Sequence, residues 1–488
     1  MPRHVPTEAT SRTSTHTRYA SHTTEVDDKA NYRHSGQPPR HNPQSNYDWK
    51  RKTQHHAHKS LQSLHGPTVA AWAFCLVTVL WRSFIKPFNT PDRVDDFSNL
   101  HRALVNFVHG HPVYIEDLST RDPHYLYSPG ATVLLSPVGW ISSDVETSRW
   151  WFILANSAAI IVGIALLFRV AGHTLGDFLF PATVTAAYFT ENVTNTLTFS
   201  NVNGICFLLL TVSINGLIKK QPLRTGLAIG LLGLIKPFFF ILLLLVVIQR
   251  MWKALGIAVA VPIVFNILGY ILIKDADVYR TTLMPYIRTP RDYANLSIVG
   301  VGLAQHWPGI VVFLLRAIVV IAALLAVYLA RTYYVSRPQV FVPTASTALL
   351  LAAILAGSLG QQYYTLFFVP VLATIKYWGW ADGAVLGAGF ASILPMNPFI
   401  FSPSHVVGVV LFSWTMLSWL VLLIGTVLIG GKNYWSTSDD RNRSTARDER
   451  ANSRTAHPDE RRRSKPTGAI RTNTPSSIRH SSTRNKTP

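Results

Sequence analysis

Two adjacent acidic residues, Asp95 and Asp96, follow the first strongly apolar segment of the chain by a few residues. A carboxylate in such a place can act as a general base that takes a proton from a hydroxyl group, while its neighbour orients it or tunes its pKa. The alternative interpretation is a pair of solvated charges in a polar loop, which is the commoner situation for an isolated pair. The surrounding sequence favours the first interpretation.

The apolar segment at residues 69–85 is long enough to cross a bilayer, since about 20 helical residues span about 30 Å of hydrocarbon. A basic segment precedes it, and the positive-inside rule keeps such a segment in the cytoplasm. We therefore expect the two aspartates to emerge on the outer side of the membrane.

The composition indicates a membrane protein. Of the 488 residues, 48% are hydrophobic and 14% are charged, whereas average soluble proteins carry about 25% charged residues. Most of the formal net charge of +20 lies in residues 1–66 and 432–488. Because these ends contain no sustained apolar period, we expect them to be disordered basic tails in the cytoplasm, with residues 67–431 forming the membrane domain. Basic segments beside membrane spans commonly lie against anionic lipid, and no motif suggests nucleic-acid binding.

The cysteines and the first apolar segment exclude two further interpretations. The chain has two cysteines, Cys75 and Cys206, and both lie in apolar segments, so neither a disulfide framework nor a zinc site is expected. The first apolar segment begins too late and is too long for a cleavable signal peptide, so we expect it to remain as an anchor.

The elements that must position the aspartates are helices. Two weakly amphipathic pieces, residues 97–108 and 131–141, predict interfacial helices on the outer surface. Further apolar segments lie at residues 150–170, 178–189, 202–218, 226–235, 238–248, 254–273, 309–330, 342–357, 364–375, 381–394 and 406–429. We expect about 10–12 spans with both termini inside.

Positive charge assigns the sides of this predicted bundle. Three basic turns belong in the cytoplasm by the positive-inside rule, and they contain Lys219, Lys220, Arg224, Arg250, Lys253, Arg331 and Arg337. This arrangement needs the two segments beside Lys236 to form a broken or re-entrant pair, and Pro237 predicts the break because it cannot donate a helical hydrogen bond. The polar segments 86–149, 191–201 and 274–307 then share the outer face.

Lys236 lies within an apolar run, where a charged group costs about 2.5–3.5 kcal/mol and needs a partner or a wet cavity. It either snorkels from a helix end or binds an anionic phosphate as a point charge. Arginines of the outer segment 288–297 could hold a phosphate through two hydrogen bonds. The phosphate-binding candidates are Lys236, Arg291 and Arg288.

Polar and aromatic residues cluster in four outer segments. Tyrosine rings can pack on the apolar face of a sugar while their hydroxyl groups reach its polar groups. For the tyrosines, the alternative is an interfacial belt at the membrane surface. For Asn201 and Asn203, the alternative is simple capping of a helix N-terminus. The sugar-binding or acceptor-binding candidates are His124, Tyr125, Tyr127, Asn201, Asn203, Tyr293, Asn295, Gln361 and Tyr363.

Six polar motifs together resemble a known family, the α(1→3)-arabinofuranosyltransferases of mycobacteria and corynebacteria. These proteins are polyprenyl-phosphate-sugar-dependent glycosyltransferases of the GT-C type. The resemblance runs from residue 95 to about residue 427 in the same order and spacing. The motifs are residues 95–114, 122–130, 191–204, 234–237, 283–297 and 361–365.

The resemblance implies an all-α polytopic membrane protein with a GT-C helical bundle in the plasma membrane and a periplasmic active site. It implies decaprenyl-phosphate-arabinofuranose as donor, an arabinan chain of arabinogalactan or lipoarabinomannan as acceptor, and an α(1→3) branch as product. In this scheme Asp96 is the general base, Asp95 its helper, and no metal or other cofactor is obligatory. Ser128 stands where the family usually has proline, so we expect a slightly looser loop there.

Other functions remain open at this point. A polyprenyl-phosphate-mannose-dependent mannosyltransferase of phosphatidylinositol mannoside or lipomannan synthesis would use the same bundle and the same carboxylates. A transporter or flippase of lipid-linked sugars would predict inverted repeats and charges near the bilayer midplane, and the sequence shows no such internal symmetry. A passive scaffold would leave the paired aspartates and the polar clusters unexplained.

Overall fold

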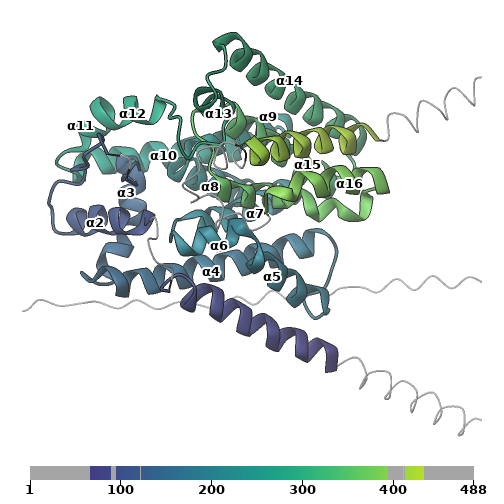
Figure 1. The fold of residues 1–488 in the computed structure, drawn as a ribbon, viewed down its shortest axis with the longest axis horizontal. Helices are drawn as coiled ribbons and strands as arrows, with labels where there is room; N and C mark the ends of the chain where they lie inside the picture. Colours follow the sequence, from purple (N-terminus) through teal and green to yellow (C-terminus); the bar gives the residue numbers. More distant parts are fainter. Residues whose placement is uncertain (1–65, 90–94, 121, 394–409, 411–412, 433–488) are drawn as a thin grey trace, which may run out of the picture. The chain divides into compact units, whose positions relative to one another are not determined.

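The structure, a computed structural model, describes residues 66–89, 95–120, 122–393, 410 and 413–432. The chain divides into two units, Met1–Leu64 and His65–Pro488, and the described residues all belong to the second. Nearly all of the two predicted tails, and the segment around residue 400, lie outside the described residues. The described part is helical and contains no strand, which confirms the all-α prediction (Figure 1).

The helices follow the predicted apolar segments closely. In chain order they are the first helix, Gly66–Ile85, then α2 (Asp96–Val108), α3 (Pro129–Leu135), η2 (Ser136–Trp140), α4 (Val145–Val170), α5 (Leu179–Phe189), α6 (Glu191–Thr198), α7 (Asn203–Ile218), α8 (Pro222–Ile235), η3 (Pro237–Leu242), α9 (Leu243–Ile248), α10 (Trp252–Leu272), α11 (Ala276–Val278), η4 (Tyr279–Leu283), α12 (Met284–Arg288), α13 (Ile298–Ala304), α14 (Gly309–Tyr334), α15 (Pro338–Leu355), η5 (Gln362–Tyr377), α16 (Trp380–Gly389), η6 (Phe390–Ile393) and a last helix, Ser413–Lys432.

Six of the described helices are long and apolar enough to cross a membrane, and four shorter apolar helices accompany them. Within their most apolar stretches, α10 is 11% buried and α15 is 83% buried. An apolar helix that exposes most of its surface is stable beside lipid, because lipid tails are as apolar as its side chains. The protein is therefore a polytopic membrane protein with α15 at its centre and α10 at its rim.

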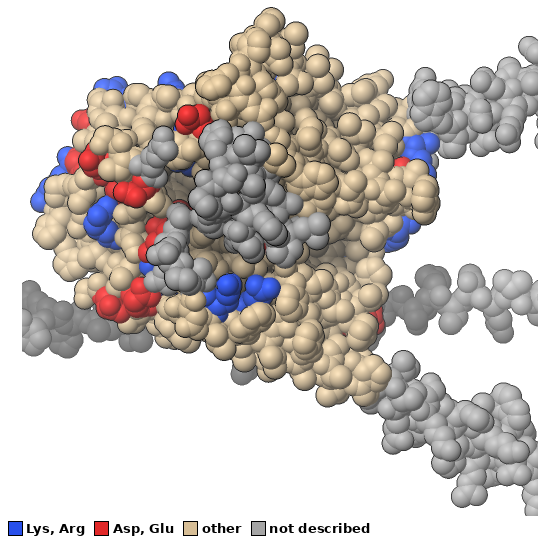
Figure 2. All heavy atoms as spheres, viewed as in Figure 1, with Lys and Arg blue, Asp and Glu red and all other residues tan. Residues whose placement is uncertain are grey.

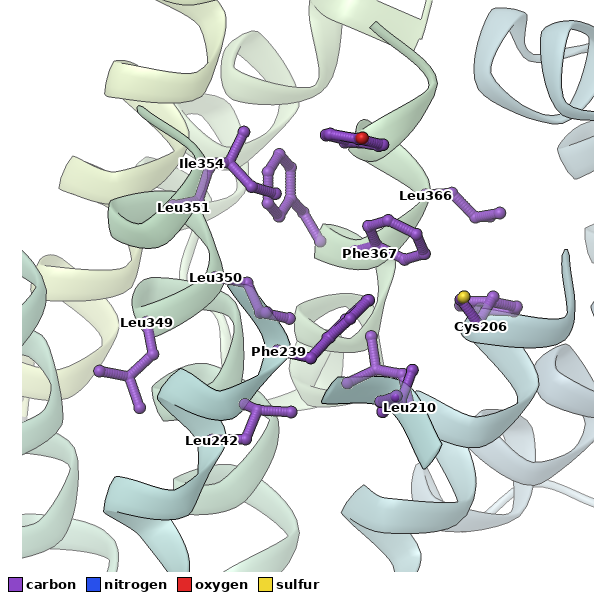
Figure 3. Close-up of a cluster of buried hydrophobic side chains, with 14 of the residues drawn as sticks. Cys206, Leu210, Phe239, Leu242, Leu349, Leu350, Leu351, Ile354, Leu366 and Phe367 are labelled. Atoms are coloured by element: carbon purple, nitrogen blue, oxygen red, sulfur yellow. The ribbon is translucent and has the colours of Figure 1, made fainter. Parts of the chain in front are cut away.

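The central core lies where α7, η3, α15 and η5 meet (Figure 3). Phe239 of η3 packs against Phe367 of η5 with ring centroids 4.9 Å apart in an edge-to-face arrangement. Leu350 of α15 and Leu210 of α7 are fully buried in the same cluster. These contacts hold η3 and η5 in fixed positions, and the residues at their N-terminal ends form part of the site described below.

The chain breaks at Lys236–Pro237 as predicted. Lys236 has extended backbone angles (φ −137°, ψ 101°) at the end of α8, and Pro237 opens the 3-10 helix η3. The pair α8 and η3–α9 thus starts and ends beside basic turns, at Arg224 and Arg250. The predicted break is confirmed, and a membrane protein tolerates such irregular backbone where protein surrounds it.

Two expectations about local structure are wrong. The segment around residues 191–201 was expected to be an outer polar loop, but it contains helix α6, all of whose residues are buried. Part of its polarity is paired inside the protein, because Asn195 Nδ2 donates to Glu191 (3.0 Å) and to Gln362 of η5 (3.2 Å). Ser128 does not loosen its loop, because its hydroxyl caps α3 by accepting from the Ala131 N–H.

The short helices α2, α3, α11 and α12 gather at one end of the bundle, on the left in Figure 1. Helices were expected at α2 and at α3–η2, and α2 buries Phe97, Leu100 and Leu104 against η2 and α4. Acidic and basic side chains crowd this end in Figure 2, while most of the neighbouring visible surface is uncharged. The loops that follow α2 and α10 meet there, because Asp275 accepts from the backbone N–H groups of Val113 and Tyr114.

Candidate functional site

Asp95 is the N-cap of α2, and its carboxylate is held by contacts within the protein. Its carboxylate accepts from the backbone N–H groups of Phe97 (2.9 Å) and Ser98 (3.2 Å) and also from the Ser98 hydroxyl. It forms an ion pair with Arg149 of α4, whose side chain is 1% exposed. Burial raises the pKa of the Asp95 carboxyl, but the hydrogen bonds from Arg149 and Ser98 outweigh burial and leave it below its ordinary value. Asp95 is therefore ionised and fixed at neutral pH.

Asp96 has the opposite electrostatic environment although it is the next residue. Its backbone N–H donates to the Phe199 carbonyl oxygen (3.2 Å), which ties α2 to the end of α6. Burial and the nearby Asp95 charge raise the pKa of its carboxyl to about 6, although Lys236, Asn201 and Arg291 act to lower it. Two carboxylates whose pKa values are pushed apart commonly divide between a structural and an acid–base role. Asp96 is the one suited to accept a proton near neutral pH.

Lys236 does not snorkel away from the bundle. Its Nζ lies 3.4 Å from the Tyr364 hydroxyl oxygen and 4.9 Å from the centre of the Tyr364 ring. Its charge acts on Asp96 and on the Tyr127 phenol. The break between α8 and η3 thus places the Lys236 ammonium group within electrostatic reach of the Asp96 carboxylate.

Arg291 brings a second cation to Asp96 from the loop after α12. Its guanidinium carbon lies 5.0 Å from the centre of the Tyr293 ring, a cation–π contact, and its side chain also hydrogen-bonds to Tyr286. Among the described residues, Nε of Arg291 is buried without a hydrogen-bond partner. A buried N–H donor without a partner costs free energy unless a ligand or a water molecule supplies an acceptor.

Tyrosines line the same space. Tyr127 is acted on by both Lys236 and Asp96, and the charge of Asp96 also acts on the Tyr363 phenol. The Tyr363 ring is held edge-on to Tyr364, with centroids 5.3 Å apart. Asp96, Lys236, Arg291, Tyr127 and Tyr363 therefore form one cluster, although they come from five separate segments of the chain.

The Asn201 and Asn203 pair follows α6 and opens α7. Asn201 accepts from the Asn203 N–H (3.1 Å) just before α7, while its buried amide nitrogen lies near Asp96 without a hydrogen bond of ordinary geometry among the described residues. Asn203 is fully buried, and in the described part of the chain neither polar atom of its side chain has a partner. Cys206, one turn later on the same helix face, is near Lys236, so Asn203 faces the cluster. The bond from the Asn203 N–H gives the Asn201 side chain a structural role. Among the described residues no contact gives such a role to the polar atoms of the Asn203 side chain.

Other predicted site residues do not reach the cluster. Asn295 has no capacity left for a sugar, because its amide donates to the carbonyl oxygens of Arg291 and Ser358 and accepts from two backbone N–H groups. It instead joins the Arg291 loop to the loop before η5. Gln361 reinforces this joint by donating to the Ala294 carbonyl oxygen (3.0 Å).

Three further residues that were predicted to bind sugar or phosphate make their contacts outside the cluster. Tyr125 is buried, and its hydroxyl bonds to Thr132 (2.7 Å), so it packs the loop rather than facing a ligand. His124 contacts Thr120 and the Tyr286 ring. Arg288 is exposed, and its charge acts on Tyr279 rather than on Asp96.

Two residues of the site were missed in the sequence. Arg149 was taken as the end of a polar stretch, yet a charged residue one turn into an apolar helix signals a buried partner. Tyr364 was taken as the start of an apolar segment, yet it contacts Lys236. Backbone strain marks the site too: Ser200 (φ 49°) and Ala294 (φ 46°) are non-glycine residues in the left-handed region, beside Asn201 and Asn295.

Replacing Arg149 by Met is expected to destabilise the fold by about 3–5 kcal/mol, because it leaves the Asp95 carboxylate partly buried without its partner. Since the pKa of Asp95 is lower in the folded state, its stabilisation is present above the unfolded pKa of about 3.9 and is lost as the pH falls through the folded value. Thermal unfolding in detergent at pH 7 measures the loss. An unchanged midpoint would show that the ion pair contributes nothing.

A cavity of about 490 Å³ lies between α4, α5, α6 and η5. Its lining is almost wholly apolar, with Leu167, Phe207 and Leu366 among its residues. Phe207 and Leu366 belong to α7 and η5, the helices that also carry Cys206 and Tyr364. Its volume is in the range of pockets that bind small organic ligands or hydrocarbon chains.

Comparisons with known proteins identify the family of this chain. Residues 125–359 match the model of glycosyltransferase family 87. An α-(1→3)-arabinofuranosyltransferase of Corynebacterium glutamicum is 37% identical over 308 residues, which cover 62% of this chain and 72% of that protein. Proteins of the same name from Mycolicibacterium smegmatis and Mycobacterium tuberculosis are each 38% identical, over 308 and 310 residues, which cover 62% and 63% of this chain and 71% of each relative. This chain therefore belongs to the family of the α-(1→3)-arabinofuranosyltransferases.

Proposed function

We propose that this membrane arabinosyltransferase moves arabinofuranose from decaprenyl-phosphate-arabinofuranose to an arabinan chain. The product would be an α(1→3) branch in arabinogalactan and in lipoarabinomannan. The observation that carries the proposal is the meeting of Asp96, a carboxylate with a pKa of about 6, with the cations of Lys236 and Arg291. A base beside two cations is what transfer of a sugar from a phosphate to a hydroxyl group needs.

In the proposed reaction Asp96 takes the proton of the acceptor hydroxyl group as its oxygen bonds to the anomeric carbon of the donor sugar. The bond from that carbon to the phosphate oxygen breaks, and the phosphate leaves with the bonding electrons. Lys236 and Arg291 stabilise the charge that grows on the phosphate. Asn203 and the hydroxyl groups of Tyr127 and Tyr363 are placed to bond to sugar hydroxyls, because they border the same space.

The apolar cavity supports a lipid-linked donor. In this proposal the phosphate of the donor binds Lys236 and part of its hydrocarbon chain occupies the cavity. Each buried methylene group is worth about 0.8 kcal/mol, so even part of a prenyl chain would bind firmly there. A soluble nucleotide-sugar donor would have no use for such a cavity.

We also propose that the site faces the periplasm and that both termini are cytoplasmic. The support is charge: the basic turns after α7, α9 and α14 lie at the far ends of helices that lead away from the cluster. A C-terminal reporter that works only in the cytoplasm should be active. A silent reporter would mean an odd number of spans.

We propose that the tails, residues 1–66 and 432–488, place the protein in the membrane and take no part in chemistry. A chain reduced to residues 66–434 should keep the turnover of the full chain and lose only some expression or orientation fidelity. Turnover per molecule in membranes measures this, and a large loss in correctly inserted protein would assign the tails a part in the reaction.

No obligatory metal is proposed, because Lys236 and Arg291 already supply two positive charges for the leaving phosphate. Treatment with EDTA is expected to leave turnover unchanged. Loss of activity in EDTA, with recovery on adding a divalent cation, would contradict this account.

The decisive experiment measures turnover in membranes with synthetic polyprenyl-phosphate-arabinofuranose and a short linear arabinan, followed by linkage analysis of the product. A new α(1→3) linkage is expected. Transfer from polyprenyl-phosphate-mannose instead would identify a mannosyltransferase and overturn the proposal.

A further inference from the structure

Asp275 lies between α10 and α11, outside the cluster around Asp96. Its two carboxylate oxygens accept the backbone N–H groups of Val113 (2.9 Å) and Tyr114 (2.6 Å). Hydrogen bonds to an ionised acceptor are about twice as strong as neutral ones. One side chain therefore fastens the loop after α2 to the end of α10, across 161 residues of sequence.

Tyr114 continues this attachment toward the site. It is 6% exposed, and its ring lies 6.0 Å from the rings of both Tyr125 and Tyr279. Its hydroxyl group donates to the Tyr127 carbonyl oxygen (3.1 Å). Asp275 thus fixes the backbone of Tyr114, and Tyr114 in turn fixes the backbone of Tyr127.

Tyr127 is the residue at which this chain of hydrogen bonds reaches the cluster. Its ring packs at 5.4 Å from the Tyr125 ring, and its phenol is acted on by both Lys236 and Asp96. With its carbonyl and its ring both held, the phenol has little freedom to move. A displacement of about 1 Å at a reacting centre can cost about 10²-fold in rate.

We propose that Asp275 is a positioning residue, which acts through Tyr114 to hold Tyr127 against Asp96 and Lys236 during sugar transfer. The inference rests on the proposed function, since Tyr127 must contact the substrate for its position to matter. The loop has a separate attachment in the pair of Arg102 and Glu116 (2.6 Å), so loss of the Asp275 bonds leaves it folded.

The test compares three substitutions in the full-length protein. Asp275→Asn replaces one carboxylate oxygen by a donor, which cannot accept an N–H group, and Tyr114→Phe removes one hydroxyl group while it keeps the ring. We expect each of these two substitutions to lower kcat by about tenfold, because each removes one or two charge-assisted or buried hydrogen bonds. Asp277→Asn is the matched control, because Asp277 is exposed in α11 two residues away, and its kcat should equal that of the unsubstituted protein.

A double-mutant cycle separates positioning from general destabilisation. Asp275→Asn should cause no further loss in a Tyr127→Phe background, because the residue that it positions no longer carries the hydroxyl group. Additive losses, or an unchanged kcat in Asp275→Asn, overturn the inference. Amide hydrogen exchange over residues 122–130 should accelerate in Asp275→Asn and not in Asp277→Asn, and equal exchange in the two overturns it as well. Failure of the unsubstituted protein to use a polyprenyl-phosphate-arabinose donor overturns the proposed function alone, and the exchange result then decides the inference.

Discussion

Asp96→Asn is expected to lower the rate of arabinose transfer by about 10²–10⁴-fold, the usual effect of losing a positioned general base. Asn is nearly the same size as Asp and cannot accept the proton. The backbone bond from residue 96 to Phe199 is unaffected by the substitution, so normal abundance in the membrane is expected. Turnover per molecule in membranes, with abundance measured on the same sample, gives the result.

Asp95→Asn is the comparison that tests the role of Asp95 as helper. Asn caps helices about as well as Asp, so α2 should still begin at residue 96, but the ion pair with Arg149 is lost. Its main effect should be on stability, with a smaller loss of rate than in Asp96→Asn. Retention of most activity by both variants would remove both aspartates from the mechanism.

The pH dependence follows from the same pair. Asp96 must be ionised to act as a base, so kcat/KM should fall as the pH drops through about 6. The charge of Asp95 raises the pKa of Asp96, so Asp95→Asn should move this acid limb to lower pH. A profile that is flat between pH 5 and 7 in the unsubstituted protein would contradict the assignment.

The sequence could predict the helices because apolar length and breakers determine them locally. The break at Lys236–Pro237 follows from proline chemistry alone, and α4 and α10 follow from long apolar runs. It could not predict that α6 is buried, because the polar residues of α6 look like a loop until their partners are known. Asn195 finds Gln362 across 167 residues of sequence, and no local pattern reveals such a pair.

The same limit applies to the site. Asp96 and Lys236 were identified because a charge beside or within an apolar segment needs a reason to be there. Asn295 and Tyr125 were chosen for their side-chain chemistry, but packing gave their polar atoms other partners. Long-range contacts decide which polar groups in a loop have no partner within the protein and can bind a ligand. A local sequence pattern does not reveal these contacts.

Lys236→Met is expected to lower kcat/KM for the donor by about 10²–10³-fold, the typical cost of removing one group that stabilises charge in a transition state. Met keeps most of the length of the side chain and an apolar stem but carries no charge. Lys253→Met is the matched control, because Lys253 is exposed at the start of α10 and lies in one of the basic turns. The control should retain its kcat/KM.

The division of the loss between kcat and KM identifies the part that Lys236 plays. If its charge bound the donor phosphate equally well before and during bond cleavage, KM would rise and kcat would stay the same. Because the phosphate gains charge as the sugar leaves, a cation 3.4 Å from Tyr364 and beside Asp96 should favour the transition state, and kcat should fall even at saturating donor. Unchanged kcat and unchanged donor affinity in Lys236→Met would remove the lysine from phosphate binding and leave Arg291 as the cation of the site.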